Sequence, residues 1–508
     1  MKKINIILFT VVISLLGACG IEEDNPNLTK EDAFVSFDSY KRNIDGVYSN
    51  MIDWGYMGNQ YYFITGLGSG FGWSKRGGNN NKSFDNLTLC SLKPSNSSTY
   101  VENTWIQMYS TISKTNDIIA FSPPFESASS SEEMGINSII GEAYFLRAYN
   151  YFNLVRLWGQ VPLRTEPAIN STVHQPKSSE KAIYDQIILD ANQALLLMSE
   201  SPISGYPAKY AADMLLAKVY MTLATAEASL QDPALDYWQL AYDHAIKVHG
   251  NYTLLPNYDD LFAEDSNDAN SESIFELQVA VGASTDHVRS FTASNYTKAN
   301  TFGNIRINAD VYDLHNSTYP ADQRITSTFL TNYTQQHNGQ TYNSYPNVTN
   351  RTNWNGFPYP LKLGSKNPDN RIREGNQNVI IYRYADLLIM LAEISNELQN
   401  GEAAGYVQEV LDRVGITTPL AAYTSGDQDA FRNAIMKEYQ FELLMEGHDW
   451  YNNRRRGYDY FLNNVIIPHN TSSTFKGSID VTHETSEAIV MKLPIPASEI
   501  NYNEEIEN

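Results

Sequence analysis

The feature that most constrains the fold is a set of apolar residues that recur every three or four positions in several segments. Three such sets are Ile187, Ala191, Ala194 and Met198; Ala212, Leu216, Val219 and Leu223; and Leu387, Leu391, Ile394 and Leu398. This spacing places each set on one face of an α-helix that must pack against another element. Similar patterns predict helices over residues 33–52, 99–121, 137–158, 178–199, 207–226, 234–249 and 428–446. The chain is therefore predicted to be all-α.

Consecutive predicted helices form pairs, 137–158 with 178–199 and 207–226 with 234–249. Such pairs are typical of the helical hairpins in tetratricopeptide-like proteins. Pro207 suits the first turn of its predicted helix, where a missing backbone N–H is harmless. Since no Pro-rich or Ser-rich linker interrupts the chain, we expect one compact body over 19–508, with halves at about 19–230 and 270–508.

Two long stretches, residues 54–98 and 283–378, break the helical pattern and are rich in Gly, Asn and aromatic residues. Structureless loops longer than about 12 to 15 residues are uncommon in compact domains unless they are functional or disordered. The aromatic content argues against disorder. We therefore expect these stretches to be long irregular loops, with a few short strands, that serve the function of the protein.

The first residues have the order of a secretory signal. Lys2 and Lys3 precede an apolar run, Ile4 to Leu16, of 13 residues, which is shorter than the roughly 20 residues that span a bilayer. Small residues then lead to Cys19, and the acids Glu22, Glu23 and Asp24 follow it. We expect residues 1–18 to be a lipoprotein signal peptide and Cys19 to carry the lipid anchor, in the outer membrane and facing the exterior. The alternative is an ordinary soluble secretory signal.

The overall charge limits the partners. The formal net charge is −22, and a polyanion is repelled by nucleic acid, which is bound through clustered Lys and Arg. Nucleic acid is therefore not an expected partner. The 34 Tyr exceed the 20 Phe, and tyrosine is the aromatic residue that suits half-wet binding surfaces.

Five strings follow the lipoprotein start in a fixed order: Gly141 to Leu163, Asn270 to Gln278, Tyr382 to Glu393, Glu438 to Gly457 and Leu493 to Ile500. Together they span nearly the whole mature chain, and in this order the chain resembles the SusD/RagB family of nutrient-binding outer-membrane lipoproteins. The resemblance implies a scaffold of tetratricopeptide-like helix pairs with a ligand platform of loops. It also implies that the protein captures a glycan at the cell surface and delivers it to a SusC-like TonB-dependent transporter.

No catalytic or metal site is expected, and no cofactor. Glu446, His448 and Asp449 lack the H-E-x-x-H spacing of a zinc site. Residues 265–272 lack the Gly and the downstream Glu of a calcium loop, and a solvated turn is the expected alternative. Glycosidases need two carboxylates about 5 to 10 Å apart, and nothing in the sequence nominates such a pair. We expect Arg454, Arg455 and Arg456 to pair with Glu438, Glu442 or Glu446, and Trp450 to enter the core.

A glycan binder needs flat aromatic rings for the apolar sugar face and polar groups for the hydroxyl rim. The expected ligand-binding residues, all in the two irregular stretches, are Trp54, Tyr56, Trp73, Arg76, Asn80, Tyr296, Tyr342 and Trp354. For each aromatic residue the alternative is a loop anchor packed on the scaffold. Lys75, Arg76, Arg371 and Arg373 either admit an acidic glycan or are solvated. Two other functions stay open: peptide capture, as in RagB-like relatives, and a tetratricopeptide-type scaffold that binds only proteins.

Overall fold

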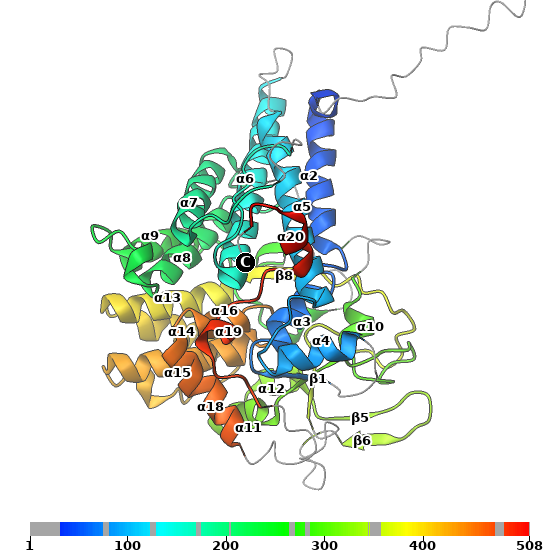
Figure 1. Cartoon of the computed structure of the whole chain (residues 1–508). Coiled ribbons are helices and arrows are strands. Elements are labelled where there is room, and N and C mark those ends of the chain that lie inside the picture. Colours follow the sequence, from blue (N-terminus) through cyan, green and yellow to red (C-terminus); the bar gives the residue numbers. More distant parts are fainter. Residues whose placement is uncertain are drawn as a thin grey trace, which may run out of the picture.

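The computed structural model describes residues 31–74, 81–121, 129–168, 174–202, 205–263, 270–279, 285–343, 345, 357–472 and 482–506. Helices dominate these residues, as the sequence predicts (Figure 1). The longer helices are α2 (Phe37–Ile52), α5 (Thr99–Ala120), α6 (Ser130–Trp158), α7 (Glu180–Leu197), α8 (Tyr210–Ala224), α9 (Tyr237–Val248), α13 (Tyr384–Leu398), α14 (Ala403–Arg413) and α15 (Gln428–Leu443).

Short helices fill much of the remaining chain. They are α3 (Gln60–Leu67), α4 (Asn81–Cys90), α10 (His287–Phe291), α11 (Ala309–Thr318), α12 (Gln323–Thr328), α16 (Asp449–Arg454), α17 (Tyr458–Phe461), α18 (Ile467–Thr471), α19 (Glu487–Val490) and α20 (Ala497–Tyr502). A π-helical segment, Leu462–Ile466, joins α17 to α18. Within the described ranges, no helix combines the length and the hydropathy that crossing a bilayer requires.

The predicted helical hairpins are confirmed. Helix α6 packs on α7, and α8 packs on α9, with α13 against α9 and α15. Buried ion pairs reinforce the apolar faces, because Arg147 of α6 makes two hydrogen bonds of 2.7 and 2.8 Å to Asp190 of α7. Lys218 of α8 lies 2.7 Å from Asp386 of α13. The result is a scaffold of paired helices of the tetratricopeptide-like kind.

The predicted first residues of two helices are wrong. Helix α6 begins at Ser130 instead of residue 137, because Ser129 and Glu132 form a reciprocal capping box. Helix α8 begins at Tyr210, so Pro207 precedes the helix and does not occupy its first turn.

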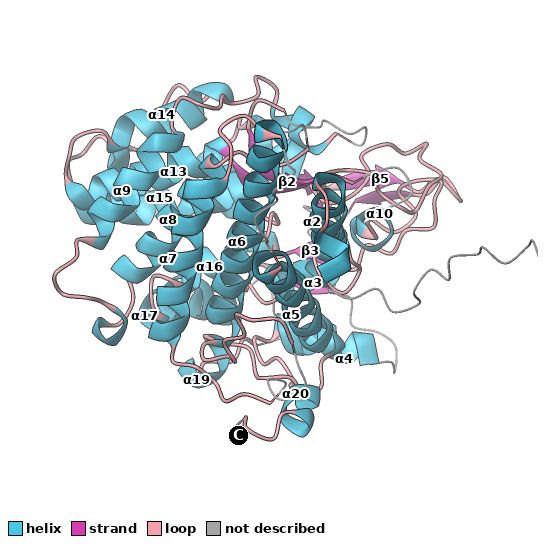
Figure 2. Ribbon diagram, turned by 90° about the horizontal axis from the view of Figure 1, so that it is seen from above, coloured by secondary structure: helices cyan, strands magenta, loops and turns pink. Residues whose placement is uncertain are grey.

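The strands form four separate antiparallel pairs. β2 (Ser273–Leu277) pairs with β8 (Val379–Arg383) beside the scaffold, where it contacts α8. The other pairs lie in the described part of the second irregular stretch together with β1, and we call this part the strand-and-loop region. They are β1 (Gly72–Ser74) with β3 (Ile305–Ile307), β4 (Phe329–Leu330) with β7 (Tyr359–Pro360), and β5 (Asn332–Thr334) with β6 (Thr341–Asn343). The β5 strand lies at the right-hand side of this region in Figures 1 and 2.

The expectation that residues 54–98 form a long loop is wrong in part, since α3, β1 and α4 lie there. Every residue of α3 is buried. A helix that is covered on all sides needs no apolar stripe, so the periodicity that reveals the scaffold helices is missing from QYYFITGL.

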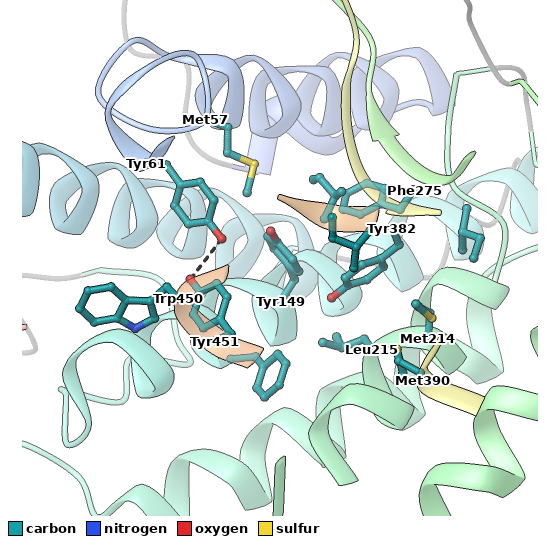
Figure 3. Packing of buried hydrophobic residues seen from close by; sticks show 14 of the residues in the cluster. Met57, Tyr61, Tyr149, Met214, Leu215, Phe275, Tyr382, Met390, Trp450 and Tyr451 are labelled. Atoms are coloured by element: carbon teal, nitrogen blue, oxygen red, sulfur yellow. Dashed lines mark hydrogen bonds between the residues drawn. The ribbon is translucent and has the colours of Figure 1, made fainter. Parts of the chain in front are cut away.

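The main hydrophobic core runs from the N-terminal helices to the C-terminal segment and is rich in aromatic residues. Figure 3 shows its centre, where Tyr149, Phe275 and Tyr382 lie together, with ring centroids of neighbouring pairs about 6 Å apart. The hydroxyl groups of Tyr61 and Tyr451 form a 3.1 Å hydrogen bond inside this core. Buried tyrosines contribute apolar area, and a pair such as Tyr61 and Tyr451 also satisfies its hydroxyl groups.

Candidate functional site

A buried network of charges attaches the strand-and-loop region to the scaffold. Glu438, Glu442 and Glu446 follow one another at intervals of four residues, on α15 and just after it, and all are buried. Arg324, on α12 in the strand-and-loop region, lies 2.5 Å from Glu438 and 2.9 Å from Glu442. Lys362 of the same region lies 2.8 Å from Glu446. The long region between β3 and β8 is therefore held to the scaffold by ion pairs.

Two scaffold arginines complete this network. Arg383 contacts Glu442 at 2.5 Å and Glu446 at 2.7 Å, and Arg413 also pairs with Glu442. Burial alone would raise the pKa of Glu442, but Arg413, Arg383 and Arg324 outweigh burial and hold that pKa well below its usual range. For Glu438 the balance is reversed, and burial raises its pKa despite Arg324. Glu442 is therefore the central charged acceptor of the network.

The arginine partners predicted for this segment are wrong. Arg455 and Arg456 pair with Glu393 of α13. Arg454 donates hydrogen bonds of 2.9 and 2.8 Å to the carbonyl oxygens of Gly68 and Val490. The three glutamates of the motif already have other partners. The expected burial of Trp450 is confirmed, since its side chain is 2% exposed.

On the outer side of the strand-and-loop region, the hairpin of β5 and β6 carries a cluster of tyrosines. Tyr333 and Tyr342 are cross-strand partners, and their rings stack at 5.8 Å and 19°. Tyr296 meets Tyr333 edge-on, also at 5.8 Å. Tyr333 is buried, whereas Tyr296 and Tyr342 are half-exposed. We call these three residues the tyrosine surface.

Buried residues pack against the inner side of the tyrosine surface. The Tyr333 ring packs edge-on against Tyr359, and the guanidinium of Arg306 lies 3.8 Å from the centre of the Tyr359 ring. Arg306 also donates hydrogen bonds to the Tyr359 hydroxyl and, at 2.9 Å, to the carbonyl oxygen of Phe357. The Phe357 ring meets the Trp73 ring edge-on at 6.0 Å. The half-exposed rings therefore rest on a rigid buried layer.

The exposed polar residues of the hairpin lie on its other face. Asn332, Thr334 and Thr341 are exposed, and they alternate with Tyr333 and Tyr342 along β5 and β6, so their side chains point to the opposite face of the strands. Gly339, in the turn of the hairpin, has a φ of +68°, a left-handed conformation that favours glycine. Half-exposed rings suit a ligand that has an apolar face.

The structure brings the two irregular stretches together, as a shared platform requires. Strand β1 of the first stretch pairs with β3 of the second. The Asn59 side chain donates a 2.8 Å hydrogen bond to Ser290 of α10, and the His287 ring lies 2.8 Å from the carbonyl oxygen of Met57. Burial lowers the pKa of His287 to about 4, so this ring is neutral near pH 7.

The predicted site residues differ in exposure. Trp54 is 42% exposed, and Tyr296 and Tyr342 are half-exposed. Tyr56 is fully buried, its hydroxyl donating a 3.0 Å hydrogen bond to Asn150, and Trp73 is 2% exposed. Neither of these two rings offers a face to a ligand, so the structure places them in the packing beneath the surface. Four predicted site residues lie outside the described residues: Cys19, Arg76, Asn80 and Trp354.

The sequence interpretation missed Tyr333 and Arg306. The alternation of Asn332, Tyr333 and Thr334 is the signal of a strand with one buried face, but three residues are too few to separate it from chance. Arg371 and Arg373 are exposed. Among the described residues, no group of three or more His, Cys, Asp or Glu side chains is placed to hold a metal ion.

Comparison with known families gives two matches. Residues 250–508 match the model described as the SusD family, and residues 72–221 match a model described as starch-binding associating with outer membrane. The SusD-like protein P2 of Formosa agariphila is 24% identical over 90% of this chain and 91% of its own length. A SusD-like protein of Bacteroides ovatus is 25% identical over 68% of this chain and 64% of its own length.

Solved structures share the fold. A SusD homolog from Bacteroides thetaiotaomicron superposes with a TM-score of 0.77 at 19% identity, covering 96% of this chain and 99% of the other. A crystal structure with xylogluco-oligosaccharide gives 0.71 at 20% identity, with 92% and 97% covered. A laminarin-binding SusD-like protein gives 0.67 at 21% identity, with 92% and 98% covered.

Proposed function

Because this chain belongs to the SusD family, we propose that it is a lipid-anchored protein of the outer membrane that binds an oligosaccharide or polysaccharide at the cell surface. It delivers this glycan, unchanged, to a SusC-like TonB-dependent transporter. Two of the solved proteins with the same fold are described as laminarin-binding or were crystallised with a xylogluco-oligosaccharide. These similarities support a glycan as the ligand class.

The observation that carries the proposal is the tyrosine surface. Tyr296 and Tyr342 are half-exposed and both pack on the buried Tyr333. Rings held in this way lose little side-chain entropy when a ligand binds, because packing has already fixed their positions. The apolar face of a sugar stacks on such a ring, and its hydroxyl groups stay free to form hydrogen bonds at the rim of the ring.

The expected affinity is weak to moderate. One ring stacked on a sugar hides about 60–80 Å² of apolar surface, which contributes about 1.5–2 kcal/mol. Two rings contribute about 3–4 kcal/mol, close to the 4.1 kcal/mol of a millimolar dissociation constant. We therefore expect dissociation constants from micromolar to millimolar that fall as the oligosaccharide becomes longer and reaches both rings. Such affinities also permit release to a transporter.

Calorimetry on the soluble chain that begins after Cys19 tests glycan binding. A panel of soluble oligosaccharides and polysaccharides identifies the ligand, and Tyr342→Ala and Tyr296→Ala should each weaken its binding about tenfold, equal to about 1.4 kcal/mol. Tyr502→Ala is the matched control, because Tyr502 is 62% exposed on α20, away from the β5–β6 hairpin (Figure 1).

Three results would contradict the proposal of a non-catalytic glycan binder. They are the absence of binding to every glycan in the panel, binding of peptides alone, and cleavage of the bound oligosaccharide by the purified chain. Unchanged affinity in both tyrosine variants, with glycan binding intact, would instead move the site away from the tyrosine surface.

The anchor and the transporter need separate experiments in the native membrane. Cys19→Ser should release the protein from the outer membrane or leave it uncleaved, because the proposed anchor is the acylated Cys19 sulfur. The unaltered protein should co-purify from detergent with a large TonB-dependent barrel. Outer-membrane retention of a Cys19→Ser protein that carries no lipid would contradict the anchor, and recovery of the chain alone would contradict the delivery role.

A further inference from the structure

A cavity of about 300 Å³ lies in a different part of the molecule from the tyrosine surface. It is bounded by α11, α15, the π-helical segment and α18, together with the turn at Gly70 and Phe71. These helices lie near the lower end of the molecule in Figure 1. None of the three residues of the tyrosine surface is among the residues that line this cavity.

One buried amide lines this cavity. Asn308 is 3% exposed, and its Nδ2 donates a 2.9 Å hydrogen bond to the carbonyl oxygen of Gly70. Its Oδ1 has no hydrogen-bond partner among the described residues and is closed to solvent. An unsatisfied buried polar atom costs about 1–3 kcal/mol, so the fold tolerates a local penalty at the wall of this cavity.

Other amides enlarge this polar lining. Gln440 of α15 is 9% exposed and lines the cavity, and within the described part of the chain its side chain makes no hydrogen bond. Asn453 of α16 is 7% exposed and also lines it. A carboxamide both donates and accepts, as does a sugar hydroxyl. The lining therefore matches a neutral group that has several hydroxyls.

The remaining walls are apolar. Phe71, Val311, Met436 and Val465 contribute hydrophobic surface, and Phe71 is only half-buried. Charged residues are few and balanced, since Lys437 and Asp310 line the cavity beside one titratable ring, His469. An apolar wall, an aromatic ring and a few convergent amides are the usual composition of a small-molecule site, and about 300 Å³ is at the lower end of the range for such sites.

The backbone is irregular at the same place. Leu462–Ile466 is π-helical, and its residues Asn464 and Val465 line the cavity. Single π-helical turns occur frequently at functional sites, because the wider turn moves side chains out of their regular α-helical positions. This observation is independent of the unpaired amides.

We propose that this cavity is a second binding site, for a single neutral sugar ring, distinct from the platform that binds the longer glycan. The apolar face of the ring lies on Phe71, and its hydroxyls hydrogen-bond with the Gln440 amide. The site selects against ionic ligands, because a lining with one acid and one base gives no net attraction for either sign of charge.

Saturation-transfer NMR and calorimetric titration with methyl glycosides of glucose, galactose and xylose test this site. At least one should bind the full soluble chain with a millimolar dissociation constant. Gln440→Met keeps the side-chain length and removes the amide, and should weaken binding tenfold or more. Tyr342→Ala should leave it unchanged.

A matched pair of variants distinguishes loss of the binding site from loss of the fold. Asn464 and Asn463 are neighbours, both exposed, and each donates a hydrogen bond to the carbonyl four residues earlier, at 3.0 and 2.8 Å. Only Asn464 lines the cavity. Asn464→Trp should therefore block the methyl glycoside, and Asn463→Trp should not.

Three results would overturn the second site. They are no binding of any of the three methyl glycosides, equal effects of the two tryptophan variants, and stronger binding of glucuronate or inorganic phosphate than of the neutral sugars. Loss of methyl glycoside binding in Tyr342→Ala with retention in Asn464→Trp would assign the binding to the tyrosine surface instead. The glycan proposal stands or falls separately, because its own variants lie outside this cavity.

Discussion

The helical scaffold and the strand-and-loop region both contain buried ion pairs, but they differ in how their apolar residues are arranged. In the scaffold, helices such as α7 and α8 bury apolar faces that recur with the helical period. The strand-and-loop region has only short strands, and two of its cations, Arg324 and Lys362, are buried against Glu438, Glu442 and Glu446 at the end of the scaffold.

Apolar helix faces and buried ion pairs make different demands on the residues that form them. An apolar helix face tolerates exchange among residues of similar volume. A buried ion pair fixes the geometry of its partners, and it becomes costly when one partner is lost. A binding surface on irregular chain needs the second kind of support, because its own strands are too short to hold it.

Loss of the central acceptor of the network should have the largest effect. Glu442→Gln leaves Arg324, Arg383 and Arg413 buried around a neutral side chain, and breaking a buried pair in this way costs about 3–5 kcal/mol. Denaturant unfolding of the purified variant measures this loss. Glu397→Gln is the control, because its partner Arg432 has a side chain that is 27% exposed, and pairs near the surface contribute about 0–1 kcal/mol.

The same network predicts a dependence on pH. The pKa of folded Glu442 lies well below the usual value, so its contribution is fully present above the unfolded pKa of about 4.3 and is lost as pH falls. Stability of the unaltered chain should therefore fall as the pH decreases below about 4.3, and less steeply in Glu442→Gln. Equal slopes in the two proteins, or equal losses in Glu442→Gln and Glu397→Gln at pH 7, would remove the proposed contrast between the two regions.

The next largest loss of stability is expected at Trp73, in contrast to Trp54, the other described tryptophan among the predicted ligand-binding residues. Trp73 is 2% exposed, so Trp73→Ala removes a large buried ring and should cost about 3–5 kcal/mol. Thermal unfolding followed by circular dichroism measures it. A folded variant of unchanged stability that has lost glycan affinity would instead place Trp73 in contact with the ligand.

The sequence predicts the scaffold better than the site. The apolar residues of α7 recur with the helical period because one face of this helix is wet. In α8 and α13, which are largely buried, charged side chains such as Lys218 and Asp386 interrupt the apolar surface and reveal the period. Helix α3 shows no such pattern, because it has only eight residues, all of them buried and none of them charged. The exposure of Trp54 and the burial of Tyr56 depend on which side chain the neighbouring α5, α6 and α10 segments cover, and no local pattern encodes that.

The sequence predicts only part of the candidate site, for the same reason. The aromatic content of the second irregular stretch points to Tyr296 and Tyr342, but Tyr333, which contacts both, is recognisable only when β5 and β6 are paired. The partners of Glu442 come from residues 324, 383 and 413, and such separations are fixed by the fold. The spacing of the glutamates predicts a charged helix face and does not identify its cations.

A smaller effect of opposite sign is expected in the scaffold. Glu142 of α6 is buried, and burial raises its pKa to about 8. Between the unfolded pKa of about 4.3 and pH 8 the folded chain retains a proton that the unfolded chain releases, so stability falls as pH rises through this range. Glu142→Gln imitates the protonated form and accepts from Tyr48, whose hydroxyl lies 2.9 Å from Glu142 Oε2.

Urea unfolding at pH 5 and pH 8 measures this prediction. Glu142→Gln should be more stable than the unaltered chain at pH 8, by more than about 1 kcal/mol, since each unit of pKa shift corresponds to about 1.36 kcal/mol. At pH 5 the two proteins should differ little. A variant that is less stable at both values would show that the carboxylate is charged and paired in the folded chain.

The smallest effect on stability is expected at Trp54. Its side chain is 42% exposed, and truncation of a surface side chain usually changes stability by no more than about 0.5 kcal/mol. Trp54→Ala should therefore leave the melting temperature close to that of the unaltered chain, in contrast to Trp73→Ala.

Trp54 is also a test of how far the ligand platform extends. Residues 57–59, which follow Trp54 closely in the chain, contact α10, and α10 precedes the loop that carries Tyr296. If the ligand extends over both irregular stretches, Trp54→Ala should weaken binding of a long oligosaccharide several-fold and binding of a short one hardly at all. Calorimetry with two chain lengths decides this, and equal affinities for the long ligand in Trp54→Ala and the unaltered chain would confine the platform to the tyrosine surface.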